Sequence, residues 1–175
     1  MTAPAHRASP AAWWARHTVE SMSESASQLT DIATRDDVER LVRAFYTKAL
    51  SDPIIGFIFT DVAHLDVEAH VPEITSFWET VLLGAKSYSG GAFRPHAELH
   101  AKVHLREGHF ERWLQLWFGT VDEMFKGEVA GQAKVHALRV AHAFLRRLDG
   151  MPSPITPAPI MPTGLAITQM PGAGD

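Results

Sequence analysis

The sequence contains no cysteine among its 175 residues. Disulfide bonds, thiolate nucleophiles, cysteine zinc sites and iron–sulfur clusters are therefore excluded. The chain also lacks an apolar run near the ~18 residues that span a membrane, and an apolar N-terminal segment typical of a secretory signal. Its net charge is −4, with no basic stripe, which argues against nucleic acid as a partner. We therefore expect a cytoplasmic protein that binds neither membranes nor nucleic acid.

Period-two alternation, the pattern of a half-buried strand, is missing as well, whereas apolar residues recur at helical spacing. Hydrophobic residues make up 46% of the chain, which is enough for a core. The periodic segments predict helices over 34–50, 66–84, 94–103, 109–125 and 128–148. The sequence therefore predicts an all-α fold.

Local signals mark where these helices begin and end. Thr34 and Asp37 have the spacing of a capping box, and Pro53 stops the first helix. Residues 54–59 read I-I-G-F-I-F and predict one or two helical turns under the core. Pro72 requires the next helix to start near it or to bend there, and Gly84 suits a C-terminal cap.

The two ends of the chain differ in composition from its middle. Residues 1–30 are rich in Ala, Ser and Pro and contain the pair Trp13–Trp14, with a short amphipathic helix at 11–22. Residues 150–175 hold six of the eleven prolines and no Lys or Arg. We expect both ends to be mostly disordered and residues 31–149 to form one folded domain. A cofactor-free helical interaction module that uses Trp13–Trp14 and the proline-rich tail is one reading of this organisation.

Six of the ten histidines fall between residues 64 and 109. His96, His100 and His104 are four residues apart, so a helix would bring them to roughly one face. Adjacent members would suit a divalent metal, which leaves a zinc-dependent hydrolase as an alternative. For His100 and His104 we expect a solvated polar face or capping contacts instead. His109 is interpreted as an N-terminal residue of its helix.

His70 and His96 differ from the others in their surroundings. His70 opens the apolar face of one helix, and His96 follows the loop after that helix. A haem requires an apolar cleft and one strong axial donor, and a neutral imidazole provides that donor. The nearby patterns are rich in aromatic residues, namely Phe45, Phe59, Phe77, Trp78 and Trp113. From the residues alone, an ordinary aromatic core and a haem pocket both remain open.

Five motifs in fixed order resemble the third group of truncated haemoglobins. They are L-V-R-A-F-Y, P-I-I-G-F-I-F, A-H-V-P-E-I-T-S-F-W-E-T-V-L-L-G, Y-S-G-G-A-F-R-P-H and H-F-E-R-W-L-Q-L-W. The resemblance covers about residues 31–148. It implies a truncated globin, with a two-over-two helical sandwich around haem b (iron protoporphyrin IX).

The resemblance also implies roles for particular side chains. Tyr46 would point into the distal pocket, Phe59 would wedge against the haem, and Trp113 would hydrogen-bond a ligand on the iron. His70 would be the distal-helix histidine, acting as a donor, a gate or a sixth ligand. The cofactor-binding residues that it implies are Phe45, Tyr46, Phe59, His70, Phe77, Trp78, Tyr88, His96 and Trp113.

Two histidines compete for the role of proximal iron ligand. The family's interval counted forward from Tyr88 leads to His96, whereas the commonest interval counted back from His109 leads to His100. Members with a longer link before H-F-x-R-W favour His96. The dipeptide at 91–92 is Gly-Ala instead of a common Asn-Pro, but this change removes no pocket residue.

The function implied is reversible binding of dioxygen or of another ligand such as NO, CO or peroxide. The alternative is a haem-dependent redox enzyme, either peroxidase-like or a nitric oxide dioxygenase. Turnover would require an unidentified external reductase, because the sequence shows no reductase domain and no flavin motif. Binding is therefore ranked above catalysis.

Overall fold

The structure is a computed structural model that describes residues 29–151. Its elements are α2 (Arg35–Leu50), the π-helix η1 (Ile58–Val62), α3 (Val67–Leu83), α4 (Phe93–Lys102), α5 (Glu107–Met124) and α6 (Glu128–Leu148). No strand occurs between residues 29 and 151, and the all-α prediction is confirmed. The expected helix at 11–22, the pair Trp13–Trp14 and the proline-rich segment from residue 152 lie outside the described residues.

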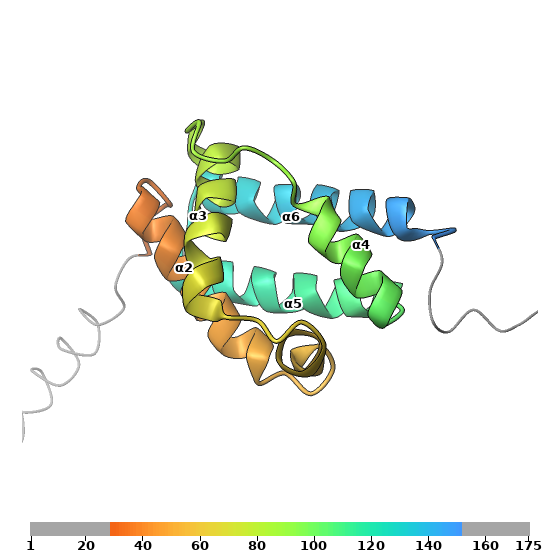
Figure 1. Cartoon of the computed structure of the whole chain (residues 1–175). Helices are drawn as coiled ribbons and strands as arrows, with labels where there is room; N and C mark the ends of the chain where they lie inside the picture. Colours follow the sequence, from red (N-terminus) through yellow and green to blue (C-terminus); the bar gives the residue numbers. More distant parts are fainter. Residues whose placement is uncertain (1–28, 152–175) are drawn as a thin grey trace, which may run out of the picture.

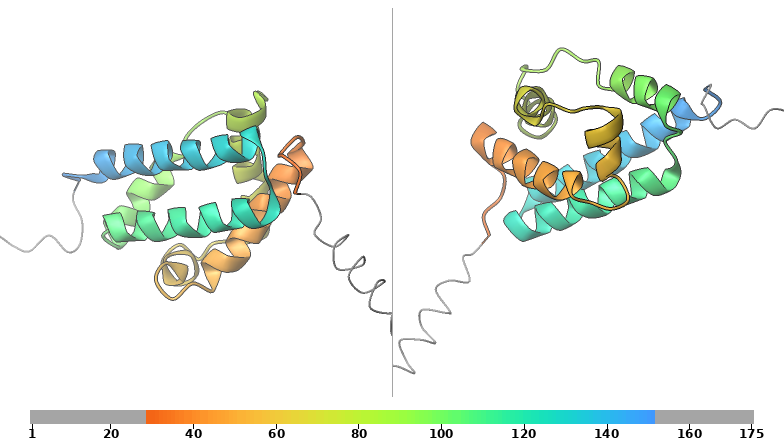
Figure 2. Two further views of the ribbon diagram at one scale, coloured as in Figure 1. Left: turned by 180° about the vertical axis from the view of Figure 1, so that it is seen from behind. Right: turned by 60° about the horizontal axis from the view of Figure 1, so that its bottom comes forward.

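The helices form two crossed layers (Figure 1). In one layer α2 packs against α3, and in the other α5 packs against α6. The layers meet where α2 contacts α5 and α3 contacts α6, which is the two-over-two arrangement. α4 stands apart from this sandwich and packs mainly against α6 and η1, beside the C-terminal half of α6 (Figure 2).

The capping box and the apolar face that were predicted for α2 are both present. The Thr34 hydroxyl accepts a hydrogen bond from the amide of Asp37 at 3.2 Å, and the Asp37 carboxylate accepts from the amide of Thr34 at 2.9 Å. This reciprocal capping box satisfies amides that have no partner within the helix. The apolar stripe of α2 faces the core and consists of Val38, Leu41, Val42, Phe45, Tyr46 and Ala49.

The connector after α2 is only partly buried against the core. Its helical part is η1, and Ile55 and Ile58 are buried. A side chain at Gly56 would bring a Cβ atom to 2.7 Å from the Leu50 carbonyl oxygen, so this close approach requires glycine. Ile54 and Phe57 remain 49% and 39% exposed, so only part of the segment lies under the core as predicted.

α3 carries a proline within its first two turns. Asp66 caps the helix by accepting from the amide of Ala69 at 3.1 Å, and Gly84 ends it at a φ of 70°. Pro72 lies inside the helix and has no amide, so the Glu68 carbonyl lacks its usual i+4 donor. The predicted C-terminal cap is confirmed, and the irregular turn lies two residues after His70.

Contacts of the Glu79 carboxylate fix the start of the loop between α3 and α4. This group accepts hydrogen bonds from Arg35 and from the Ser87 hydroxyl, each at 2.6 Å. The Tyr88 amide donates to the Thr80 hydroxyl at 3.2 Å. The loop is therefore fastened to α3 up to Tyr88.

The segment before α2 returns to the last helix. Asp31 accepts from the amides of Val129 and Ala130 at 2.9 and 2.8 Å, and the Thr30 carbonyl accepts from the Lys126 amide. α6 has no side-chain cap from its own N-cap residue, Gly127. Asp31, which lies 98 residues before Val129 in the sequence, therefore caps the N-terminus of α6.

Candidate functional site

Three of the predicted site residues meet in one aromatic cluster. The Tyr46 ring of α2 lies 5.9 Å from the Phe59 ring of η1 and 5.6 Å from the His70 ring of α3, centroid to centroid. Both pairs are close to perpendicular, at 88° and 79°. Such edge-to-face contacts hold aromatic rings in defined positions. Residues from three elements thus converge on the Tyr46 side chain.

Burial keeps the two polar members of this cluster uncharged near neutral pH. It raises the pKa of Tyr46 well above the usual value, and the charge of Glu73 adds to the effect. Burial also lowers the pKa of His70, although Glu73 opposes that change. Between residues 29 and 151, no hydrogen-bonding group contributes to the raised pKa of Tyr46, whose causes are burial and the charge of Glu73. The phenol is therefore a neutral donor that has no partner in this part of the chain.

Trp113 joins the same cluster through Phe45. The Phe45 ring lies 5.3 Å from Tyr46 and 5.7 Å from Trp113, centroid to centroid. Trp113 also runs parallel to Trp117, with centroids 5.9 Å apart and an interplanar angle of 4°. Its indole N–H makes no hydrogen bond to any residue that the structure describes. Two unpaired donors, one phenol and one indole, therefore lie on either side of Phe45.

The remaining predicted residues of α3 form a second aromatic group. The Phe77 ring lies 5.1 Å from Trp78 and 5.4 Å from Tyr88, in edge-to-face geometry. Trp78 is buried and stacks on Trp117 at 4.4 Å, so this group is continuous with the first through α5. Eight of the nine predicted residues therefore belong to one aromatic network, and His96 lies outside it.

His96 is held by the backbone of its own helix. Its Nδ1–H donates to the Ala92 carbonyl at 2.8 Å, which fixes the tautomer and leaves the Nε2 lone pair unshared. Burial lowers the pKa of His96, the hydrogen bond to Ala92 opposes this, and the proximity of His70 lowers it further. The ring also packs against Phe144 of α6 at 4.6 Å. A neutral imidazole oriented through its second nitrogen is the arrangement that metal-ligating histidines have.

His100 differs from what the sequence led us to expect. It is only 2% exposed, and neither of its ring nitrogens has a hydrogen-bond partner within 29–151. Its ring lies 4.9 Å from that of His104, whose buried Nδ1 also lacks a partner. The prediction of a solvated face or capping contacts is wrong for His100, because α4 turns this side of the helix toward η1 and α6.

The two candidates for the proximal ligand differ in their hydrogen bonding. His96 has a carbonyl acceptor for Nδ1–H, whereas no described group orients the His100 ring. Three histidine or carboxylate side chains close enough to share a metal ion occur nowhere in residues 29–151, so the zinc alternative gains no support. The prediction for His109 is confirmed, since its Nδ1 accepts from the Arg106 amide at 3.2 Å in the first turn of α5.

Sequence reasoning missed two side chains that complete this arrangement. Trp117 connects the aromatic residues of α2, α3 and α5, and Phe144 supports the His96 ring. Both positions fall on predicted apolar faces, Trp117 being four residues after Trp113. Helical periodicity therefore identified them as buried, but their partners belong to other helices and depend on tertiary packing.

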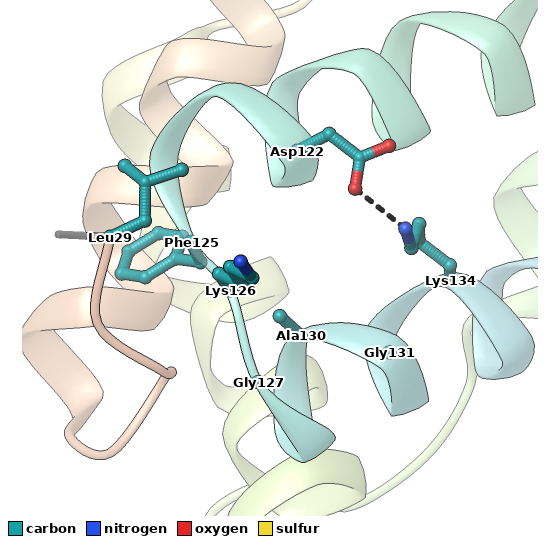
Figure 3. A pocket seen from close by; sticks show the side chains of 8 residues that line it. All are labelled: Leu29, Asp122, Phe125, Lys126, Gly127, Ala130, Gly131 and Lys134. Carbon is teal, nitrogen blue, oxygen red and sulfur yellow. Dashed lines mark hydrogen bonds and ion pairs between the residues drawn. The ribbon is translucent and has the colours of Figure 1, made fainter. Parts of the chain in front are cut away.

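A hollow of the surface lies away from these residues (Figure 3). It has a volume of about 290 Å³ and is flanked by an ion pair between Asp122 and Lys134 at 2.6 Å. Gly127 of the turn between α5 and α6 and Ala130 in the first turn of α6 are among the residues that line it. None of the predicted site residues lines it.

Comparison with known proteins identifies the class of fold. No protein-family model matches the chain, and no curated protein matches it. Among solved structures, the group III truncated hemoglobin from Campylobacter jejuni is similar, with a TM-score of 0.61 and 24% sequence identity. The match covers 69% of this chain and 95% of that one.

The described helices therefore have the fold of a truncated globin. This result confirms the fold implied by the five motifs and the suspected likeness to group III proteins. In the part of the chain that the structure describes, no helix is long and apolar enough to cross a membrane.

Proposed function

We propose that residues 31–149 form a haem-binding globin domain that reversibly binds dioxygen or another diatomic ligand. The observation that carries the proposal is the pairing of two sites within a truncated-globin fold. His96 has an oriented, unshared Nε2 lone pair, and Tyr46, Trp113 and His70 form a neutral aromatic cluster. The donor set fits haem b, because one imidazole and an apolar surround are what haem requires. Held by one histidine, haem iron supplies a further coordination position for a small ligand.

His96 is the residue that would hold the iron. Its Nδ1–H bond to the Ala92 carbonyl increases the basicity of Nε2 and fixes the ring plane. Phe144 packs against the ring and limits its rotation. Because burial lowers the pKa of His96, the imidazole stays neutral at pH 7 and protons do not compete for Nε2.

Tyr46 and Trp113 would hold the ligand. The Tyr46 hydroxyl and the Trp113 indole N–H are donors without partners among residues 29–151, and both are neutral. Hydrogen bonds to a charged acceptor in a dry pocket contribute roughly 1.5–3 kcal/mol. His70, whose ring lies 5.6 Å from that of Tyr46, is a third donor or a gate. Phe45, Phe59, Phe77, Trp78 and Tyr88 would exclude water.

An absorption spectrum of the purified full-length protein tests this proposal. We expect a Soret band that shifts when the reduced protein is exposed to carbon monoxide. His96→Ala should lose or displace the band, and His100→Ala, one helical turn away, is the matched control that should keep it. A colourless protein that does not take up added hemin would disprove haem binding. Loss of the band in His100→Ala alone would reassign the proximal ligand.

A haem-dependent redox activity, peroxidase-like or as a nitric oxide dioxygenase, is the second candidate. The neutral His70 imidazole beside the Tyr46 hydroxyl is an acid–base pair of the kind that peroxide reduction uses. Turnover would require electrons from an external donor. Steady-state peroxide consumption with a one-electron reductant, compared with His70→Leu, distinguishes this activity from binding alone: catalysis predicts a loss of at least tenfold.

A further inference from the structure

Three tryptophans from two helices form one continuous stack. The Trp113 and Trp117 indoles of α5 lie 5.9 Å apart at 4°, and the Trp117 and Trp78 indoles lie 4.4 Å apart at 17°. Helical spacing accounts for the first contact, since the two residues are four apart. The second contact joins α5 to α3 and is made by tertiary packing alone. The path for an electron from one indole to the next is therefore short, and electron transfer between two groups becomes faster as their separation falls.

The central ring of the stack, Trp117, and one of its end rings, Trp78, are shielded from water. Trp117 is 1% exposed and Trp78 is 2% exposed, whereas Trp113 is half-buried. Phe45 packs edge-on against both Trp113 and Trp117, and its other neighbour is Tyr46. Trp113 is therefore the end of the stack that reaches Tyr46 through Phe45, and Trp78 is the end that contacts Phe77 of the second aromatic group.

The hydrogen bonding of Trp117 determines what its oxidation would produce. Its indole N–H donates to the Ala133 carbonyl at 3.3 Å. A carbonyl accepts a hydrogen bond but is too weak a base to take the proton. An electron therefore leaves this indole without a proton, and a cation radical remains that the neighbouring indoles stabilise by sharing the charge. Tyr46 is a poorer donor, because its oxidation requires loss of the hydroxyl proton and burial raises its pKa.

We propose that the stack of Trp113, Trp117 and Trp78 supplies one electron when the haem-loaded protein meets a peroxide. Reduction of hydrogen peroxide breaks the O–O bond, consumes two protons and two electrons, and forms two waters. In the haem-loaded protein the stack would supply one electron and the bound cofactor the second, and an external one-electron reductant would later restore both. Both protons come from solvent. The assignment rests on the proposed haem binding and adds a second redox-active site to it.

Freeze-quench electron paramagnetic resonance of the full-length, haem-loaded protein tests this assignment. One equivalent of hydrogen peroxide should give an organic radical within milliseconds. In protein grown with ring-deuterated tryptophan the signal should narrow, and ring-deuterated tyrosine should leave it unchanged. Because this measurement uses the unaltered chain, it does not depend on whether a variant folds. A signal that responds only to deuterated tyrosine, or the absence of any organic radical, would overturn the assignment.

Variants then locate the electron donor. Trp117→Phe should lower the radical yield at least fivefold and should speed peroxide bleaching of the haem at least twofold. Trp14→Phe, which removes an indole that is not one of the three, should change neither quantity. A yield within twofold of the unaltered protein in Trp117→Phe would contradict the proposal. A Soret band that shifts with carbon monoxide is required before each experiment, so failure of haem binding and failure of the stack are distinguishable.

Discussion

The two sides of the candidate site are built differently. Tyr46, His70 and Trp113 come from helices of the sandwich, Phe59 comes from η1, and these residues are joined through aromatic rings at defined angles. His96 lies on α4, a ten-residue helix that packs mainly on α6 and η1. The first side is part of the core, whereas the second is attached to it.

This difference predicts which part of the fold opens locally at the lowest free energy. Segments with few buried apolar contacts open locally at a lower free energy than the core. The one buried residue of α4 is His100, and its two ring nitrogens lack partners within the described segment. Leaving a buried polar group unpaired costs about 1–3 kcal/mol. We therefore expect the side that carries Tyr46 to be rigid and the α4 side that carries His96 to be the more adaptable one.

Removing the Trp117 side chain, at the centre of the rigid side, should have the largest effect on the free energy of unfolding. Trp117→Ala deletes a fully buried indole that contacts Phe45, Trp78 and Trp113, and we expect the free energy of unfolding to fall by about 3–5 kcal/mol. Phe93→Ala on α4 removes a half-buried ring and should cost about half as much. Urea denaturation of both variants measures the two values. Equal losses would show that α4 is as firmly packed as the core.

A smaller change in free energy is expected when the two proposed ligand-binding donors are removed. Tyr46→Phe combined with Trp113→Phe removes two donors while the aromatic packing stays, so dioxygen should dissociate at least tenfold faster, equivalent to about 1.4 kcal/mol. Stopped-flow displacement by carbon monoxide measures the rate. Phe77→Leu, which alters the second aromatic group without removing a donor, is the control. An unchanged rate in the double variant would remove both residues from the ligand site.

On the adaptable side, one substitution should stabilise the protein. His100→Leu replaces a buried imidazole without partners by an apolar side chain of similar size, and we expect a gain of about 1 kcal/mol. Thermal unfolding should show a higher midpoint, whereas His104→Leu, at a less buried position, should change it less. A clear loss of stability in His100→Leu would mean that the imidazole has a partner that the fold requires.

The smallest change is expected from acidification. Burial lowers the pKa of His70, His96 and His109 below the usual 6.5, so below that pH the unfolded chain binds more protons than the folded one. Stability should therefore fall as the pH drops from 7 toward 5. Urea midpoints across this range measure the effect, and His96→Gln and His70→Gln should each reduce the slope. A flat profile would contradict neutral, buried histidines.

A further loss should follow in stronger acid. Burial raises the pKa of Asp31, but amide donation from Val129 and Ala130 outweighs it and leaves the value below the ordinary 3.8. Hydrogen bonds from Arg40 and Thr34 overcome burial at Asp37 and bring its pKa to about 2. Both carboxylates stabilise the fold above pH 3.8, and this contribution is lost as the pH falls toward 2. Asp37→Asn should reduce the loss of stability between pH 3.8 and pH 2, measured by urea midpoints.

Sequence patterns predicted the helices well because each signal is local. The Thr34 capping box, the Gly84 cap and the first-turn position of His109 depend on residues within one or two turns. The environment of His100 was predicted wrongly because polarity suggested solvent, and only the docking of α4 shows which face is covered. Likewise, nothing in the spacing of Trp113 and Trp117 indicates that Trp78 completes their stack.

The contact between Asp31 and α6 can form only late in the synthesis of the chain. Asp31 leaves the ribosome 98 residues before Val129, the first amide that it binds in α6. At about 5–20 residues per second, this is a delay of roughly 5–20 s. During that interval α2 and α3 are already available to pair, whereas α6 cannot be capped. We therefore expect the two helical layers to form in chain order, and the contact between Asp31 and α6 to form only after α2 and α3 have paired.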